Sequence, residues 1–146
     1  MSTATDPVRD ALSSYCAAAY DKDVERFVSL YAADLHVFDM WNAWELRGID
    51  AWRNMAAGWF GSLGTERVVV TVADVASQVA GDLALGHATL TYTAVSDDGK
   101  ELRSLDNRIT IALRRTGSEW KIFHEHTSGP IDHQSMSGKI KRESTK

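Results

Sequence analysis

The chain has little cysteine, little proline and no long apolar run. Its 146 residues include one cysteine and two prolines. A single cysteine excludes an internal disulfide, and Cys16 lies among alanines in a helical pattern, where a buried, unreactive thiol is expected. The N-terminus lacks a basic patch followed by an apolar stretch, so no signal peptide is predicted. Without a membrane-length segment, we expect a cytoplasmic protein with no membrane partner.

Positive charge is also scarce. The chain has 16 basic and 20 acidic residues, and its net charge of -4 argues against nucleic acid as a partner. The composition is otherwise typical of a globular protein that buries its own core. We expect a single domain over residues 1–131. The remaining residues, 132–146, are polar and rich in serine and lysine, and they predict a flexible tail.

The first half of the chain has helical periodicity and the second half has strand periodicity. Helices are predicted to begin at Pro7, after Asp23 and at about Ile49, with a short strand over Leu35–Trp41. Four strands joined by short turns are then predicted: Arg67–Val79 with a bulge near Ala73–Val75, Leu83–Val95, Glu101–Arg115, and a last strand from Trp120. Helices followed by an antiparallel meander indicate an α+β fold.

The last predicted strand, WKIFHEHTSGP, carries two histidines. Strict alternation places Trp120, Ile122, His124 and His126 on one face. We interpret this face as the wall of a pocket. The spacing of the histidines could suit a metal, but the sequence places no third ligand beside them, and no metal site is predicted.

The strand from Ser104 to Arg114 allows two interpretations. Its apolar face could pack on the core while its polar face meets water. Alternatively, the polar face, with Asp106 and Arg108, could line a pocket, and the apolar face, with Ile109 and Ile111, could pack on a second subunit. The alternation by itself favours the first interpretation.

Several segments together resemble a known family. They are the helix containing Tyr15, LYAADLHVFD (30–39), Arg47-Gly48, RITIALRR (108–115) and WKIFHEHTSGP (120–130). The chain is similar, over about Val8 to Pro130, to nuclear transport factor 2-like proteins of the SnoaL-like or ketosteroid-isomerase-like branch. Its ending also resembles the association domain of calcium/calmodulin-dependent kinase.

The resemblance implies a cone-shaped, curved antiparallel sheet wrapped on three N-terminal helices, with an internal pocket. It also implies a homodimer through the convex sheet face, formed by Leu105, Ile109 and Ile111. That arrangement favours the second interpretation of the Ser104–Arg114 strand and places Asp106 and Arg108 inside the pocket.

The isomerase branch implies catalytic roles for Tyr15 and for Asp39 as the general base, with Asp106 as a second, neutral carboxyl. The chain departs from that branch in two places. Met40 follows Asp39 where the isomerases have proline, and Arg108 would keep Asp106 ionised.

The expected ligand is small and largely apolar or aromatic. Trp41, Trp44, Trp52 and Trp59 are predicted to form core and pocket walls, with Trp41 and Trp59 in contact with the ligand. If the last turn pairs Arg115 with Glu119, Arg108 lies opposite His126. Arg108, Asp106 and His124 would then bind a carbonyl or carboxylate group.

Two functions remain open. The first is a cofactor-independent isomerase, dehydratase or cyclase, in which Asp39, Tyr15 and His126 are catalytic. The second is a non-enzymatic ligand-binding or oligomerisation module like the kinase association domain. A buried Asp39 with a raised pKa would favour the enzyme, whereas a salt-bridged or solvent-facing Asp39 would favour the module.

Overall fold

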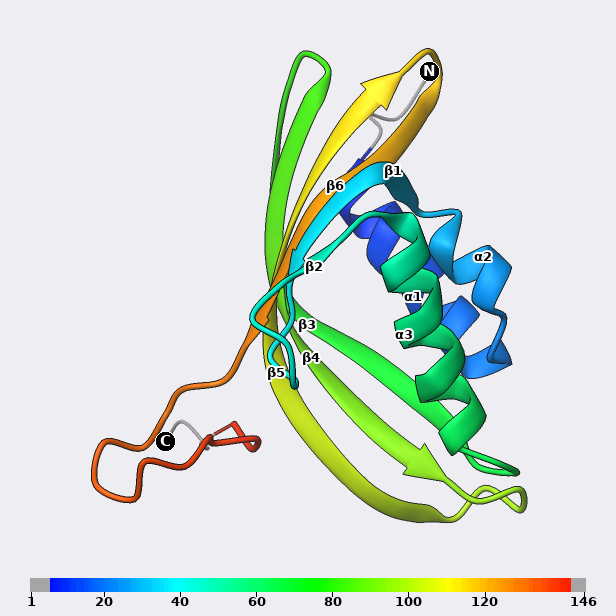
Figure 1. The fold of residues 1–146 in the computed structure, drawn as a ribbon, viewed down its shortest axis with the longest axis vertical. Coiled ribbons are helices and arrows are strands. Elements are labelled where there is room, and N and C mark those ends of the chain that lie inside the picture. Colours follow the sequence, from blue (N-terminus) through cyan, green and yellow to red (C-terminus); the bar gives the residue numbers. More distant parts are fainter. Residues whose placement is uncertain (1–5, 143–146) are drawn as a thin grey trace.

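The structure, a computed structural model, describes residues 6–142. Three helices and six strands follow one another along the chain (Figure 1). They are α1 (Pro7–Asp21), α2 (Val24–Val28), β1 (Tyr31–Phe38), β2 (Leu46–Arg47), α3 (Ile49–Ser62), β3 (Arg67–Ala80), β4 (Leu83–Val95), β5 (Glu101–Thr116) and β6 (Glu119–Ser128). The α+β class predicted from the sequence is confirmed.

The strands form one curved sheet in the order β2-β1-β6-β5-β4-β3, and the helices lie on its concave side (Figure 1). The meander from β3 to β6 is antiparallel, as predicted. The expectation of a wholly antiparallel sheet needs one correction, because β1 and β6 are parallel. These two strands are far apart in the sequence, so no hairpin turn fixes their relative direction.

Local sequence explains where the first helices begin. The Asp6 side chain accepts a hydrogen bond from the Arg9 amide at 3.1 Å, and Pro7 occupies the first position of α1. Asp23 caps α2 in the same way, through the Arg26 amide at 3.1 Å. The first strand instead begins at Tyr31, four residues before the predicted start.

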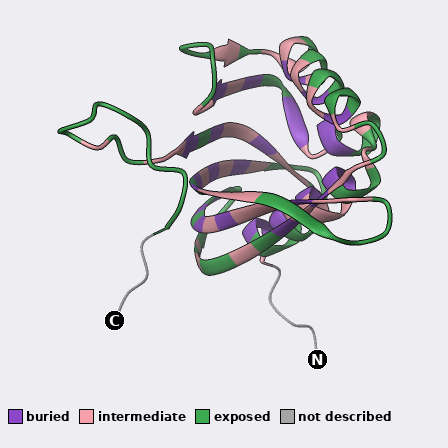
Figure 2. Cartoon of the chain, turned by 90° about the horizontal axis from the view of Figure 1, so that it is seen from below, coloured by how far each residue is buried: buried purple, intermediate pink, exposed green. Residues whose placement is uncertain are grey.

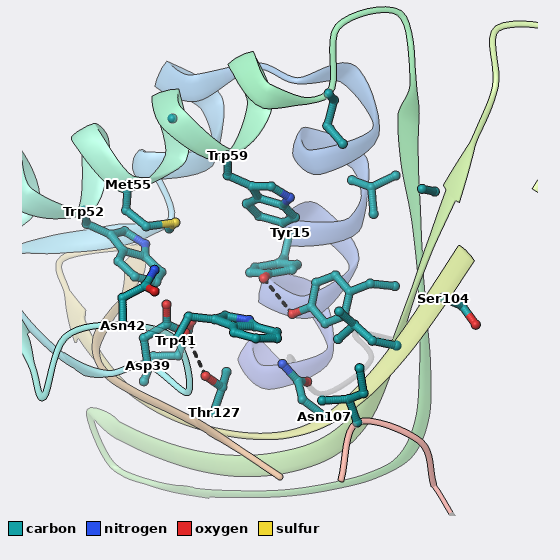
Figure 3. Close-up of a pocket in the computed structure, with 18 of the residues that line it drawn as sticks. Tyr15, Asp39, Trp41, Asn42, Trp52, Met55, Trp59, Ser104, Asn107 and Thr127 are labelled. Atoms are coloured by element: carbon teal, nitrogen blue, oxygen red, sulfur yellow. Dashed lines mark hydrogen bonds between the residues drawn. The ribbon is translucent and has the colours of Figure 1, made fainter. Parts of the chain in front are cut away.

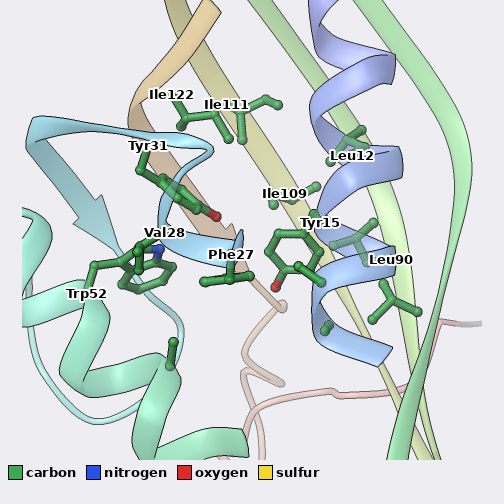
Figure 4. Packing of buried hydrophobic residues seen from close by; sticks show 14 of the residues in the cluster. Leu12, Tyr15, Phe27, Val28, Tyr31, Trp52, Leu90, Ile109, Ile111 and Ile122 are labelled. Carbon is green, nitrogen blue, oxygen red and sulfur yellow. The ribbon is translucent and has the colours of Figure 1, made fainter. Parts of the chain in front are cut away.

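The core lies between the helices and the sheet, where the buried residues concentrate (Figure 2). Phe27 of α2 stands near its centre, with ring centroids 5.1 Å from Tyr15 and 5.5 Å from Tyr31 (Figure 4). Ile109 and Ile111 approach from the sheet and are 1% exposed. The apolar face of β5 therefore packs on the helices of its own chain.

This packing corrects the interpretation drawn from the resemblance. Ile109 and Ile111 are buried in the core and Leu105 lies on the same inward face, so these three residues cannot form a dimer contact on the convex face. Asp106 and Arg108 alternate with them and lie on the convex face, outside the main pocket. The alternation of β5 by itself predicted the right face.

A bulge in β6 overturns the predicted histidine wall. Ile122 pairs with Leu113 and His124 pairs with Ala112, so Phe123 is an additional residue in β6. Because the bulge shifts the alternation by one residue, Ile122 faces the helices but His124 does not. Glu125, which is 1% exposed, faces inward instead.

The same bulge changes the pairing of β5 with β6. Thr116 pairs with Glu119 at the turn, and Arg108 pairs with Ser128. The predicted pairing of Arg108 with His126 is therefore wrong, because it assumed a different turn and an uninterrupted strand.

The segment after β6 contacts the sheet. The Asp106 amide of β5 donates to the Ile140 carbonyl oxygen at 2.7 Å, and the Lys139 amide donates to the Pro130 carbonyl oxygen at 2.7 Å. Residues 132–142, which composition placed in a flexible tail, are thus hydrogen-bonded to the domain. The rest of that predicted tail, 143–146, lies outside the described residues.

Candidate functional site

A cavity of about 700 Å³ lies between the helices and the concave face of the sheet (Figure 3). Tyr15 of α1 and Trp59 of α3 form its helical side, and Asn107 of β5 and Thr127 of β6 form part of its floor. The volume falls in the range of small-molecule sites.

Much of the cavity wall is aromatic or aliphatic. Trp41, Trp52 and Trp59 all line it, together with Met55. Trp41 is 46% exposed and belongs to the loop after β1, so it stands at the entrance rather than in the core. Trp44, predicted with the same group, is 92% exposed and does not line the cavity. Flat walls of this kind favour a flat, apolar ligand.

Asp39 lies in the cavity just beyond the end of β1. Its Oδ1 accepts hydrogen bonds from Thr127 Oγ1 at 2.8 Å and from the Met40 amide at 3.1 Å (Figure 3). Within residues 6–142, its Oδ2 has no hydrogen-bond donor and neither oxygen has an ion-pair partner. Burial raises the pKa of Asp39, although the two hydrogen bonds oppose the rise.

A second carboxyl group, Glu125, lines the same cavity. Its Oε1 accepts a hydrogen bond from the Tyr31 hydroxyl at 2.6 Å. Burial raises the pKa of Glu125 to about 8; the negative charge of Asp39 adds to the rise, and the Tyr31 hydrogen bond opposes it. At neutral pH Glu125 is therefore mostly protonated and can donate a hydrogen bond.

Two tyrosines supply a further donor. The hydroxyl oxygens of Tyr15 and Tyr92 are 2.8 Å apart, and both residues line the cavity. Burial raises the pKa of each hydroxyl, so both keep their protons at neutral pH. One hydroxyl donates to the other, which leaves the second O–H able to donate to a ligand.

Asn107 adds an unsatisfied polar atom to the cavity floor. The residue is 5% exposed, and its Oδ1 has no hydrogen-bond partner within residues 6–142. Its Nδ2 contacts the Met40 sulfur at 3.5 Å. A buried acceptor without a partner is costly.

Cations contribute little to the cavity. Arg103 lines it, but its guanidinium is bound to Glu66 at 2.7 Å. The predicted Arg–His–Asp group does not form there, because Asp106, Arg108, His124 and His126 all lie on the convex face. The predicted site residues that the structure brings together are Tyr15, Asp39, Trp41 and Trp59.

The histidines instead surround Phe38 on the convex face. The Phe38 ring centroid lies 5.0 Å from His124, 5.5 Å from His126 and 4.9 Å from His36. His124 Nδ1 is hydrogen-bonded to the His36 carbonyl oxygen at 2.7 Å. Within residues 6–142, no group of three or more His, Cys, Asp or Glu side chains could hold a metal ion.

Sequence reasoning missed Glu125, Tyr92 and Asn107. Within the Ser104–Arg114 part of β5, Asn107 stands out in the sequence as a polar residue on the apolar face, between Leu105 and Ile109. Glu125 alternates with the histidines, and only the bulge at Phe123 turns it inward.

This fold is that of nuclear transport factor 2-like proteins. An NTF2-like protein of unknown function from Pseudomonas putida KT2440 is 27% identical, with a TM-score of 0.80 over 94% of each chain. Aln2 from a Streptomyces species is 14% identical, with a TM-score of 0.72 over 83% of this chain and 86% of Aln2. At that identity the likeness shows the fold alone.

A candidate calcium/calmodulin-dependent protein kinase II association domain from Xanthomonas campestris also has this fold. It is 18% identical, with a TM-score of 0.67 over 88% of this chain and 94% of that chain. The family model described as SnoaL-like domain matches residues 8–132, and the chain therefore belongs to the SnoaL-like domain family. Among curated proteins, none matches the sequence. No helix within residues 6–142 is long and apolar enough to cross a membrane.

Proposed function

We propose that the protein is a cofactor-independent acid–base enzyme that moves a proton next to the carbonyl group of a small, flat, largely apolar molecule. The observation that carries this proposal is the state of Asp39. Its carboxylate is anchored through Oδ1, has a raised pKa and keeps Oδ2 without a hydrogen-bond donor among the described residues. These are the properties of a positioned general base.

The proposed reaction begins when Asp39 removes a proton from the carbon beside the carbonyl. The electron pair of that C–H bond forms a carbon–carbon double bond, and the carbonyl oxygen becomes an enolate oxygen. The Tyr15–Tyr92 hydroxyl pair and protonated Glu125 are the candidate donors to that oxygen. If the enolate is conjugated with a second carbon–carbon double bond, return of the proton from Asp39 to the far end of that system completes an isomerisation. If the next carbon carries a hydroxyl, its departure as hydroxide, which takes the proton from Asp39 and leaves as water, gives a dehydration.

The lining of the cavity favours a neutral substrate. It contains two carboxyl groups, Asp39 and Glu125, and its basic residue Arg103 is already paired with Glu66. A carboxylate ligand would meet the charge of Asp39 without a free cation to balance it. A ketone or quinone-like ligand needs only hydrogen-bond donors and the tryptophan walls. The carbonyl compound is therefore the better of the two ligand classes that the sequence suggested.

Exchange of hydrogen for deuterium tests the proton transfer without knowledge of the product. The protein is incubated in D₂O with a panel of flat, neutral ketones, and NMR follows the loss of the proton beside the carbonyl. We expect catalysed exchange of at least one ketone by the unaltered protein. Asp39→Asn should lower that rate by a factor on the order of 100 or more while ligand binding is retained.

Asp34→Asn is the matched control, because Asp34 lies on β1, the strand that Asp39 directly follows, but is exposed and paired with Arg114. It should exchange the ketone at the unaltered rate. Equal exchange by the Asp39→Asn variant would remove Asp39 as the base. Absence of exchange with every ketone in the panel would count against the proposed reaction class.

The alternative, a non-enzymatic binding or oligomerisation module, is less well supported. Its expected feature is a salt-bridged or solvent-facing Asp39, whereas Asp39 lies in the cavity and has no ion-pair partner among residues 6–142. The anion contacts assigned to it, Arg108 and the histidines, lie on the convex face. Self-association is compatible with either function, and we propose a homodimer through that convex face, where Phe38, Leu83 and Leu85 are exposed.

A further inference from the structure

A second cavity, of about 420 Å³, lies on the convex side of the sheet at the end of β6. We call it the basic groove. Four of its lining residues are basic: Arg108 of β5 and Lys139, Lys141 and Arg142 of the C-terminal segment. Because the whole chain carries a net charge of -4, this is a local concentration of positive charge.

The C-terminal segment builds the groove by taking the place of β6 beside β5. β6 ends at Ser128, opposite Arg108, and beyond that point the Asp106 amide of β5 donates to the Ile140 carbonyl oxygen at 2.7 Å. Ile140 lines the main cavity, whereas Lys139 and Lys141 line the basic groove.

Arg108 and Lys141 form no ion pair with a carboxylate among residues 6–142, although the Asp106 carboxylate in the same groove offsets part of the Lys141 charge. Arg108 Nε donates to Ser128 Oγ at 3.1 Å, and the Lys141 ammonium group donates to the Ser104 hydroxyl. Both contacts use neutral hydroxyls, and no carboxylate within residues 6–142 forms an ion pair with either residue. The two NH₂ groups of Arg108 remain available for a ligand.

One acidic residue, Asp106, also lines the groove. Its Oδ1 accepts from Thr91 Oγ1 at 2.7 Å and its Oδ2 from the Arg142 amide at 2.6 Å. These bonds, the Arg142 amide first, lower the pKa of Asp106, and the positive charges of Lys141 and Arg142 lower it further. Arg142 is further paired with Asp74 at 2.7 Å. Two acidic groups thus offset part of the charge, and the groove stays basic through Arg108 and Lys141.

We propose that the basic groove is a binding site for the phosphate group of a small phosphorylated molecule, distinct from the carbonyl site of the main cavity. A guanidinium with two free NH₂ groups and a nearby ammonium group can hold a tetrahedral dianion from two sides. The volume exceeds the need of a single carboxylate and falls within the range of small-molecule sites. The Ser128 and Thr89 hydroxyls that line the groove supply further donors.

The groove is coupled to the main cavity through the backbone of the C-terminal segment. A phosphate held by Lys141 and Arg108 would tie residues 139–141 more firmly to β5. The Asp106 amide, which donates to Ile140, should therefore exchange its proton with solvent more slowly when the phosphate is bound.

Isothermal titration with pyrophosphate tests the site, in chloride buffer at constant ionic strength. We expect saturable binding to the unaltered protein and roughly tenfold weaker binding to Arg108→Gln and to Lys141→Gln, because each loses one charge-assisted hydrogen bond. Arg114→Gln is the matched control. Arg114 lies on the same strand and face as Arg108 but is paired with Asp34, outside the groove.

Three results would overturn the proposal: no saturable binding of pyrophosphate, equal binding by the Arg108→Gln variant, or an equal loss in the Arg114→Gln control. Hydrogen exchange at the Asp106 amide gives a second readout, and exchange unchanged by saturating pyrophosphate would refute the coupling. Since Asp39→Asn should bind pyrophosphate normally, failure of this site and failure of the proposed enzyme are distinguishable.

Discussion

The buried carboxyl of Glu125 makes the stability of the protein depend on pH. Its pKa is about 8 in the folded chain, against an ordinary glutamate value of 4.5. Between these two values the folded state holds a proton that the unfolded state has released. The free energy of unfolding therefore falls as the pH rises from 4.5 to 8. Below pH 4.5 the carboxyl is protonated in both states, and its stabilising contribution is fully present.

The size of the effect follows from the two pKa values. Their difference of about 3.5, at about 1.4 kcal/mol for each pKa unit, corresponds to about 5 kcal/mol over the whole window. Between about pH 5 and pH 7 the expected loss is about 2–3 kcal/mol. A typical domain has about 5–15 kcal/mol of stability in total, so the loss is large enough to measure.

The assay is urea unfolding of the unaltered protein and of Glu125→Gln at about pH 5, 6, 7 and 8. Glutamine cannot ionise and its carbonyl can still accept from Tyr31, so the variant should lose most of this decline in stability. Its absolute stability can differ, because the amide is a different donor from the protonated carboxyl. The informative quantity is the slope of the unfolding free energy with pH.

Glu119→Gln is the matched control, because Glu119 lies on the same strand with a side chain that is 72% exposed. Its slope should equal that of the unaltered protein. Equal slopes of the unfolding free energy with pH in the unaltered protein and in Glu125→Gln would refute the reasoning. They would show that the carboxyl does not change its proton affinity on folding.

Two further predictions concern packing and assembly. Gly86→Ala should destabilise the protein by about 1–3 kcal/mol in the same urea assay, because the new Cβ would lie 2.8 Å from the Ala76 carbonyl oxygen and would press against Val8. Gly61→Ala in α3, where a Cβ meets nothing within 4 Å, should be neutral or stabilising, and the reverse order of the two variants would contradict the packing argument. For the proposed homodimer, light scattering at micromolar concentration should give a mass about twice 16.1 kDa, and a monomer mass would exclude it.

The sequence by itself determined the fold class, most of the elements and the central catalytic candidate. Helical and strand periods differ enough to be separated along the chain, and Asp6 and Asp23 cap helices through contacts with residues only three positions away. The bulge in β3 could also be predicted from the sequence, because the alternation of valines is interrupted there. The structure places the bulge between Ala73 and Ala76. Asp39 could be predicted through the resemblance, since its spacing from Tyr15 matches the isomerase branch without a gap.

Only the tertiary structure decided which side chains share the cavity. One additional residue at Phe123 turns Glu125 inward and the histidines outward, and a shift of one residue reverses every side chain beyond it. The contact between Tyr15 and Tyr92 joins residues 77 positions apart, and the basic groove exists because residues 139–141 replace β6 beside β5. Such long-range contacts depend on how the whole sheet packs on the helices. The local periodicity of the sequence therefore does not predict them.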